Sequence, residues 1–219
     1  MDVRYDDRVA IVTGAGAGLG RCHALLLASR GAKVVVNDPG GSVDGTGGAN
    51  AVADKVVAEI KAAGGEAVAS YASVADAASA QSIVDTAMKT WGRLDILVCN
   101  AGILRDKAFN NMDMADYEFV NQVHHFGTTY CIKAAWPIMR KQQYGRIVVT
   151  TSGSGTVGNF GQANYGAAKM AVNGLINVLR FEGAKYNIRL NAISPSAYTR
   201  MTESLLPPDM APWMKPELV

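Results

Sequence analysis

RVAIVTGAGAGLG, from Arg8 to Gly20, joins a short run of β-branched residues to a cluster of four glycines. Apolar residues then recur with helical spacing as far as Ser29. The β-branched run predicts a strand over 8–13, the glycines predict a tight turn, and the apolar pattern predicts a helix over 19–29. A strand, a turn and a helix in immediate succession are typical of the first unit of an α/β fold.

The same alternation continues along the chain. Strands are predicted over 33–37, 66–71, 94–99, 146–151 and 188–193, and helices over 51–63, 74–91, 113–142 and 162–186. The strand KVVVN at 33–37 lacks polar alternation, which indicates a sheet covered on both faces. Alternating strands and helices predict right-handed crossovers, and therefore a doubly wound, Rossmann-like parallel sheet in a three-layer α/β/α sandwich. We expect one domain over 1–219, irregular from Ser194 onward because prolines recur there.

Composition excludes several classes of partner. Of 219 residues, 49% are hydrophobic, which is enough for a large core, and 21 Lys and Arg nearly balance 19 Asp and Glu. This balance leaves no electrostatic footprint for nucleic acid or an anionic membrane. No apolar run is long enough to span a bilayer, and the acidic start does not resemble a secretory signal. Three widely spaced cysteines indicate reduced thiols, so we expect a cytoplasmic protein without a metal site.

The first glycine cluster carries a nucleotide-binding pattern. Gly14, Gly18 and Gly20 fit GxxxGxG, whereas no register fits the commoner GxGxxG. Both patterns let the backbone turn sharply after a strand and point helix N-terminal amides at phosphate, without a Cβ in the way. A flexible turn without a ligand is the alternative. The position between the first strand and the first helix favours the dinucleotide.

Asp38 stands at the end of the second predicted strand, 20 residues after Gly18. A carboxylate there can accept hydrogen bonds from an adenosine ribose and repels a 2′-phosphate. This position favours NAD over NADP as the cofactor. The alternative is a helix N-cap or an Asx turn before Pro39.

Tyr165 and Lys169 are four residues apart, which places them on one face of a helix. An ammonium group near a phenol stabilises the phenolate and lowers the pKa of the tyrosine toward that of a proton-transfer residue. Ser152 lies at the carboxyl end of the fifth predicted strand, the edge where α/β sheets bind ligands. Its hydroxyl can hold a substrate oxygen while Tyr165 moves the proton.

Five ordered motifs together resemble the short-chain dehydrogenase/reductase family. They are TGAGAGLG at 13–20, CNAG at 99–102, Ser152, YGAAK at 165–169 and NAISP at 191–195. The resemblance implies that Ser152, Tyr165 and Lys169 are catalytic and that Ser152 and Tyr165 contact the substrate. It also implies an NAD site lined by Gly14, Gly18, Leu19, Gly20, Asp38, Ser73, Val74, Asn100, Ala101, Gly102, Tyr165 and Lys169.

A narrower resemblance concerns the substrate. VVVNDPGG at 34–41, NAGILRDK at 100–107 and GNFGQANY at 158–165 are similar to the (3R)-hydroxyacyl-CoA dehydrogenase units of peroxisomal multifunctional enzymes of type 2. This implies interconversion of a (3R)-3-hydroxyacyl-CoA and a 3-oxoacyl-CoA, with the peroxisomal matrix as the alternative compartment. A 3-oxoacyl-carrier-protein reductase, a hydroxysteroid dehydrogenase and a non-enzymatic NAD-binding scaffold or sensor are the other hypotheses.

The chain also departs from the family pattern. His124 stands where most members have an asparagine, and we expect it either to support a water relay or to be a core or interface histidine. Cys99, Ala72 and Ser196 replace a family asparagine, aspartate and glycine. Family members usually continue through a further helix and a seventh strand, which this sequence does not include. Their long helices pack against another subunit, so the resemblance implies a homodimer or homotetramer.

The substrate pocket is the least defined part of the prediction. An acyl chain, or another hydrophobic secondary alcohol, needs an apolar pocket, and an acyl-CoA needs cations for its phosphates. Ordinary loop packing is the alternative for the apolar residues. The apolar candidates are Leu104, Phe160, Met201, Leu205 and Leu206, and the cationic ones are Arg105, Lys107 and Arg200.

Overall fold

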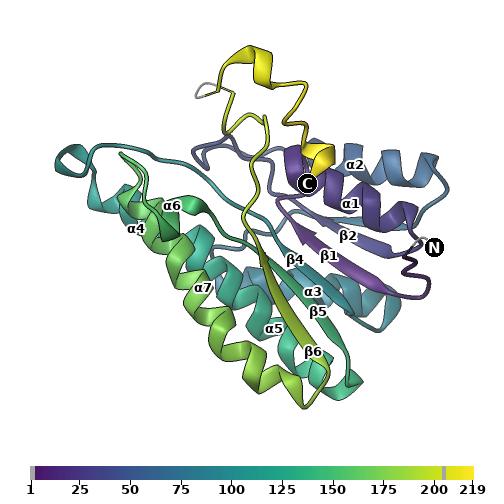
Figure 1. Cartoon of the computed structure of the whole chain (residues 1–219). Coiled ribbons are helices and arrows are strands. Elements are labelled where there is room, and N and C mark those ends of the chain that lie inside the picture. The colour runs from purple at the N-terminus through teal and green to yellow at the C-terminus, as the bar shows by residue number, and fades with distance from the viewer. Residues whose placement is uncertain (1–2, 204–205) are drawn as a thin grey trace.

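The computed structural model describes residues 3–203 and 206–219 and is built on a six-stranded sheet (Figure 1). All strand pairs are parallel, and the order is β3-β2-β1-β4-β5-β6. The strand order reverses between β1 and β4, and in such sheets ligands bind at this point, beyond the carboxyl ends of the strands. The strands are β1 (Val9–Thr13), β2 (Lys33–Asn37), β3 (Ala67–Ser70), β4 (Ile96–Cys99), β5 (Gly145–Thr150) and β6 (Ile188–Ile193).

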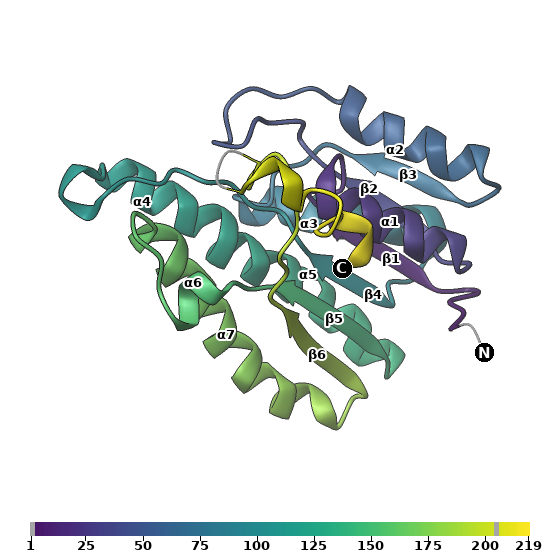
Figure 2. The same ribbon diagram turned by 45° about the horizontal axis from the view of Figure 1, so that its top comes forward.

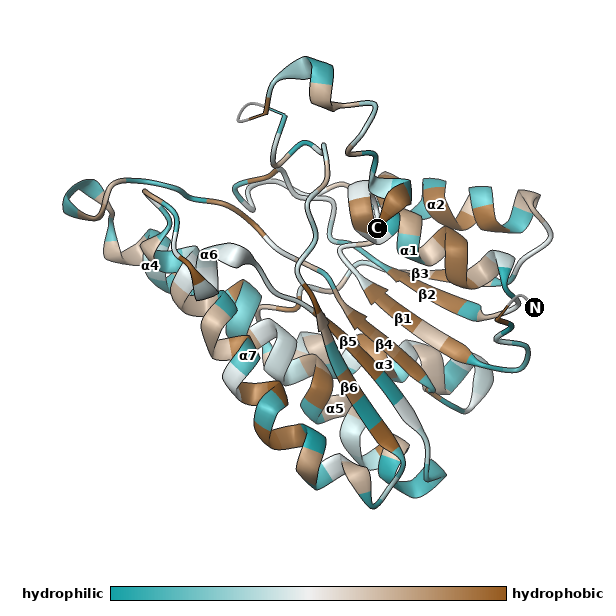
Figure 3. Ribbon diagram, viewed as in Figure 1, coloured by the Kyte–Doolittle hydropathy of each residue, from teal (hydrophilic) through white to brown (hydrophobic). Residues whose placement is uncertain are grey.

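Helices lie on both faces of the sheet, so the predicted doubly wound α/β fold is confirmed (Figures 1 and 2). One apolar core lies between the sheet and the pair α1 and α2, and a larger one lies beneath α3, α5 and α7. Figure 3 shows the central strands as mostly apolar. Within residues 3–203 and 206–219, no helix is long and apolar enough to cross a membrane. The helices are α1 (Gly18–Ser29), α2 (Ala51–Ala62), α3 (Ala77–Trp91), α4 (Met114–Asn121), α5 (Gly127–Gln142), α6 (Gly153–Thr156) and α7 (Ala163–Ala184).

The two helical layers are unequal in extent. Arg189 and Asn191 of β6 pair in register with residues of β5, and through them with residues of β4. The side chains at these positions point to the face of the sheet that α1 and α2 cover. Both side chains are nevertheless exposed, whereas Ile188 and Leu190 on the opposite face are buried under the larger layer. The sheet is therefore covered on both faces over β1 and β2, as KVVVN predicted, but not over β6.

The long helix expected over 113–142 is interrupted. Its first part, α4, passes into a π-helical turn over Gln122–Phe126 before α5 begins, and α5 contains Pro137. A π turn adds a residue to the helical repeat, so apolar spacing alone does not reveal it, and such turns occur frequently at functional sites. The turn carries His124 into the protein interior.

Two other boundaries differ from the prediction. Helix α3 starts at Ala77 rather than at 74, because the side chain of Asp76 caps the backbone N–H of Ser79. Ser73 and Val74 therefore belong to the loop at the carboxyl edge of the sheet. The short helix α6 was not expected.

The segment after β6 is irregular, as the prolines predict. It passes above the carboxyl edge of the sheet and ends beside α1 (Figures 1 and 2). Its only regular pieces within residues 194–203 and 206–219 are single 3-10 turns at Pro208–Met210 and Pro216–Leu218. The segment thus adds a third side to the crevice between β1 and β4.

Candidate active site

The glycine turn after β1 can pack closely against its neighbours only because it lacks side chains. Gly14 has a φ of +64°, and a Cβ on it would lie 2.8 Å from the Cα of Ala101. A Cβ on Gly16 would lie 2.8 Å from Asp38 Oδ2, and one on Gly20 would collide with the carbonyl oxygen of Gly14. The close approach of backbone to backbone therefore requires glycine at these positions.

The start of α1 is open to an anion. Ala17, the N-cap, makes no side-chain cap, and the first turn holds no acidic residue. The Asn100 amide donates to the carbonyl oxygens of Thr13 at 3.0 Å and Gly14 at 3.1 Å, which ties the end of β4 to the turn. The N–H groups of the first helical turn are thus left for a ligand, and a diphosphate suits them in charge.

Asp38 is fixed by the backbone on both sides. Its two carboxylate oxygens accept hydrogen bonds from the N–H groups of Gly16 at 2.8 Å and Gly40 at 2.7 Å. A carboxylate has about four acceptor sites, so these bonds leave capacity for a ribose hydroxyl. The bond to Gly40 is the turn-type contact considered as the alternative, and it coexists with a position on the cavity wall.

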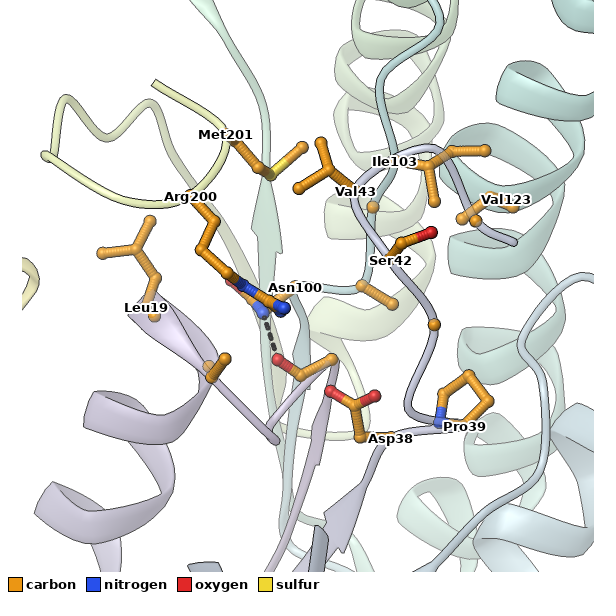
Figure 4. A pocket seen from close by; sticks show the side chains of 18 of the residues that line it. Leu19, Asp38, Pro39, Ser42, Val43, Asn100, Ile103, Val123, Arg200 and Met201 are labelled. Carbon is orange, nitrogen blue, oxygen red and sulfur yellow. Dashed lines mark hydrogen bonds between the residues drawn. The ribbon is translucent and has the colours of Figure 1, made fainter. Parts of the chain in front are cut away.

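A cavity of about 550 Å³ lies at this edge of the sheet (Figure 4). Its wall includes every residue expected to contact the dinucleotide except Tyr165 and Lys169. The expected residues that line it are Gly14, Gly18, Leu19, Gly20, Asp38, Ser73, Val74, Asn100, Ala101 and Gly102.

Two walls of this cavity were not expected. The second glycine cluster forms one wall with Gly41, Ser42 and Val43, and the segment after β6 forms another with Thr199 and Arg200. Figure 4 shows the Arg200 side chain extending toward Asn100. The density of glycine over 40–48 is a signal for the first wall, and Arg200 on the second wall was expected at the substrate rather than at the dinucleotide.

Ser152 and Tyr165 meet beside the cavity rather than among its lining residues. Ser152 is the N-cap of α6, where its Oγ accepts a hydrogen bond from the Ser154 N–H at 3.2 Å. Tyr165 lies in the first turn of α7 and hydrogen-bonds the Ser152 side chain. Burial raises the pKa of Tyr165, the hydrogen bond from Ser152 opposes that rise, and the charge of Asp106 adds to it.

Lys169 lies one helical turn beyond Tyr165, with its Nζ 5.4 Å from the centroid of the tyrosine ring. The ammonium group donates to the carbonyl oxygen of Thr150 at 2.6 Å. Burial lowers the pKa of Lys169 to about 7. The predicted lowering of the Tyr165 pKa by Lys169 is therefore wrong in direction here, because desolvation of the phenol dominates and the lysine is itself only partly charged at neutral pH.

His124 is buried against the same tyrosine. The two rings meet edge to face with centroids 5.0 Å apart, and a Cβ on Gly102 would collide with the imidazole. Its Nε2 lies within hydrogen-bond distance of both the N–H and the carbonyl oxygen of Ile103, and Nδ1 has no partner within the described residues. Burial and the charge of Lys169 hold the pKa of His124 well below its ordinary value, so the ring is neutral.

The comparisons with known proteins show the family to which the chain belongs. The family model of the short chain dehydrogenases matches residues 8–208. The chain is a short-chain dehydrogenase/reductase. It is 55% identical to a short-chain type dehydrogenase/reductase of Mycobacterium tuberculosis, over 97% of this chain and 74% of that one. It is also 55% identical to the peroxisomal multifunctional enzyme type 2 of Drosophila melanogaster, over 99% of this chain but only 36% of the relative.

A solved structure is similar as well. A 7α-hydroxysteroid dehydrogenase in complex with NADH and 7-oxo glycochenodeoxycholic acid superposes with a TM-score of 0.85. The two chains are 33% identical, over 94% of this chain and 78% of that one. As a short-chain dehydrogenase/reductase, the protein is an oxidoreductase that acts on CH–OH groups. This agrees with the expected enzyme class and family.

The expected substrate residues of this short-chain dehydrogenase/reductase are dispersed. Of the apolar candidates, Met201 lines the cavity, Phe160 is 89% exposed, and Leu205 lies outside the described residues. The backbone N–H of Leu104 bonds to Val43 in the loop after β2, and that of Leu206 bonds to Thr202 in its own loop. Of the four candidates within the described residues, only Met201 lines the cavity.

The cationic candidates are also separated. Arg105 pairs with Asp116, and Lys107 pairs with both Asp113 and Asp116, so their charges are already balanced. Arg200 alone of the three reaches the dinucleotide cavity. An acyl-CoA phosphate site made of all three is therefore not formed.

Proposed function

We propose that this short-chain dehydrogenase/reductase uses NAD to interconvert a (3R)-3-hydroxyacyl-CoA and its 3-oxo form. The observation that carries the reaction type is the hydrogen-bonded pair Ser152 and Tyr165 beside the cavity at the sheet edge. The substrate class is supported by the likeness to a peroxisomal multifunctional enzyme over nearly the whole chain. This likeness also supports a peroxisomal location. The cytoplasmic location expected from the sequence stays a prediction.

The glycine cradle suits a dinucleotide. The glycines keep the turn close to its neighbours, and the start of α1 on the cavity wall has no side-chain cap, which suits a chain of phosphates. Gly14, Gly18 and Gly20 would hold the diphosphate, and Asp38 the adenosine ribose, which selects NAD. When bound, the nicotinamide accepts the hydride that leaves the substrate carbon.

The side chains then have separate tasks. Ser152 Oγ orients the substrate oxygen, and Tyr165 in its phenolate form takes the hydroxyl proton during oxidation. In the reverse direction the neutral phenol donates that proton. Because burial raises the pKa of Tyr165, we expect the oxidation rate to increase with pH and the reduction rate to decrease through the same ionisation.

Lys169 is placed to serve the same proton. Its Nζ is held by the Thr150 carbonyl near the tyrosine ring, and its lowered pKa lets it exchange a proton near neutral pH. His124 lies on the other side of the ring with an unpartnered Nδ1, which suits a water-relay role.

A hydroxysteroid is the second candidate substrate. The solved hydroxysteroid dehydrogenase aligns over 94% of this chain, and its ligand is also a secondary alcohol or ketone. A carrier-protein reductase is less well supported, because Asp38 disfavours the NADP that such enzymes generally use. A scaffold without chemistry would not need half-buried Ser152 and Tyr165 beside a buried Lys169.

Formation of NADH with a panel of substrates tests the proposal. The panel contains (3R)- and (3S)-3-hydroxyacyl-CoA, a 7α-hydroxysteroid and simple secondary alcohols, each offered with NAD or NADP. We expect the highest kcat/KM with the (3R)-thioester and NAD. A higher value with the steroid selects the second candidate, and no reduced cofactor with any alcohol contradicts the enzyme mechanism.

A further inference from the structure

A line of polar side chains leads from Ser152 to a carboxylate that the proposed mechanism does not use. Ser152 Oγ lies 3.3 Å from Ser154 Oγ, and Ser154 Oγ donates a hydrogen bond to Gln162 Oε1 at 2.7 Å. Gln162 Nε2 in turn donates to Asp106 Oδ2 at 2.7 Å. The four residues come from α6, the N-cap of α7 and the loop after β4.

The middle of this line is buried and fully occupied. Gln162 is 7% exposed, and its Oε1 also accepts a hydrogen bond from Asn159 Nδ2 at 3.1 Å. The amide cannot be reversed, because Oε1 would then face the Asp106 carboxylate. Since Ser154 donates its only hydroxyl proton to Gln162, the single hydroxyl proton of Ser152 is shared between Ser154 and Tyr165, while Ser152 Oγ is held by the N–H of Ser154 at 3.2 Å. From Ser154 to Asp106 the side-chain hydrogen bonds run in one direction.

Asp106 is held firmly at the end of the line. The loop that carries it is fastened to α7 on both sides, because Asn164 Nδ2 donates to the carbonyl oxygen of Arg105 at 2.9 Å. The Lys107 N–H also donates to the carbonyl oxygen of Gly161 at 2.9 Å. This double attachment fixes the distance from the carboxylate to Gln162.

We propose that Asp106 and Gln162 are positioning residues, which act through Ser154 to hold the Ser152 hydroxyl against Tyr165. The proposal rests on the function proposed above for Ser152 and Tyr165. It extends the site by the exposed carboxylate of Asp106 and the buried amide of Gln162, both outside the serine, tyrosine and lysine set.

The charges around Tyr165 determine the direction in which Asp106 shifts the pKa of the phenol, and this direction can be measured. Tyr165 faces Asp106, the neutral His124 and the buried Lys169. The neighbouring cations Arg105 and Lys107 turn away to Asp116 and Asp113, and Asp106 has no ion pair within the described residues. Its negative charge therefore acts on Tyr165 without a local counter-ion and raises the pKa of the phenol.

Two substitutions separate geometry from charge. Gln162→Leu removes both amide groups and breaks the line, and we expect kcat to fall about tenfold with the KM for NAD unchanged, since one net hydrogen bond corresponds to about that factor. Asp106→Asn keeps an oxygen that accepts from Gln162 but removes the charge. We expect it to retain most of kcat and to shift the rise of the oxidation rate to lower pH.

The pKa of Tyr165 can also be followed without turnover. In protein labelled with ring-13C tyrosine, the resonance of Tyr165 is assigned by its loss in Tyr165→Phe, and its titration midpoint is read directly. We expect a lower midpoint in Asp106→Asn than in the parent protein. This measurement tests the inference even if the substrate panel yields no activity, so failure of the proposed function is distinguishable from failure of the inference.

Asp113→Asn is the matched control, because it removes the same charge from an exposed side chain that pairs with Lys107. We expect its midpoint and its kcat to match those of the parent protein. If Gln162→Leu does not fold, Ser154→Ala breaks the same line with a smaller change. Parent-like kcat in both the Gln162 and Ser154 variants, or equal midpoint shifts in Asp106→Asn and Asp113→Asn, would overturn the proposal.

Discussion

At the scale of single residues, Asp38 decides which cofactor the cavity favours. Its carboxylate is fixed by the N–H groups of Gly16 and Gly40, so its charge stays where an adenosine ribose would lie. We predict that Asp38→Asn, which keeps an acceptor but loses the charge, lowers the ratio of kcat/KM for NAD to that for NADP about tenfold. Steady-state kinetics with both cofactors measure the ratio, and an unchanged ratio would remove Asp38 from cofactor selection.

Lys169 makes a prediction about stability and pH. Its pKa falls from 10.5 to about 7 on burial, so the unfolded chain binds more protons than the folded one between these values. The stability of the protein should therefore increase with pH across this window, relative to Lys169→Met, which has no such group. Chemical denaturation of both proteins at pH 6.5, 8 and 9.5 measures the difference, and a difference that does not change with pH contradicts a buried, depressed lysine.

Sequence spacing predicted the neighbours of each of these residues but not their electrostatics. Four residues along a helix place Tyr165 and Lys169 together, and the end of a strand places Asp38 at the sheet edge. The direction of a pKa shift depends on burial, which arises from segments far away in the chain. The hydrogen-bonded pair Gln162 and Asp106 was missed for a related reason, since 56 residues separate its members.

At the scale of elements, a glycine of the turn after β1 and a glycine of α7 differ in the space around them. A Cβ on Gly20 meets the Gly14 carbonyl, whereas Gly174, inside α7, faces open space. We predict that Gly20→Ala destabilises the protein by about 1–3 kcal/mol and abolishes NAD binding, because the turn must shift. Gly174→Ala should stabilise by about 0.5–1 kcal/mol through helix propensity and leave binding intact. Denaturation and calorimetric titration with NADH measure both, and equal effects would contradict the packed turn.

Strands were the most predictable elements. The apolar runs locate all six strands, five of them within one residue at each end. Helices were less well located where one local contact overrides periodicity, as at the cap made by Asp76 and at the π-helical turn around His124. Both departures lie next to the site, so the differences from regular geometry are concentrated where the residues proposed for function lie.

At the scale of the whole molecule, α7 presents an apolar surface to solvent. Met170, Val178 and Phe181 share one side of the helix and are 52%, 57% and 72% exposed. Exposed apolar patches of this kind mark contacts between subunits. We predict a homodimer or homotetramer by light scattering and dissociation in Phe181→Glu. A parent protein that is monomeric at micromolar concentration would contradict this expectation.

The overall topology followed from the sequence, but the enclosure of the site did not. Alternating strands and helices fix the sheet and place its carboxyl edge. Two walls of the cavity come from the loop after β2 and the segment after β6, which carry no periodic pattern. Their positions depend on contacts such as that of Leu104 with Val43, formed only in the folded chain.

The central claim is that Tyr165 transfers the substrate proton beside a bound dinucleotide. Tyr165→Phe tests it most directly, because it removes one hydroxyl from a site that the cavity lining does not include. The account predicts an unchanged dissociation constant for NADH and a loss of at least a hundredfold in kcat with the best substrate of the panel. A variant that binds NADH normally and retains near-normal turnover would contradict the account.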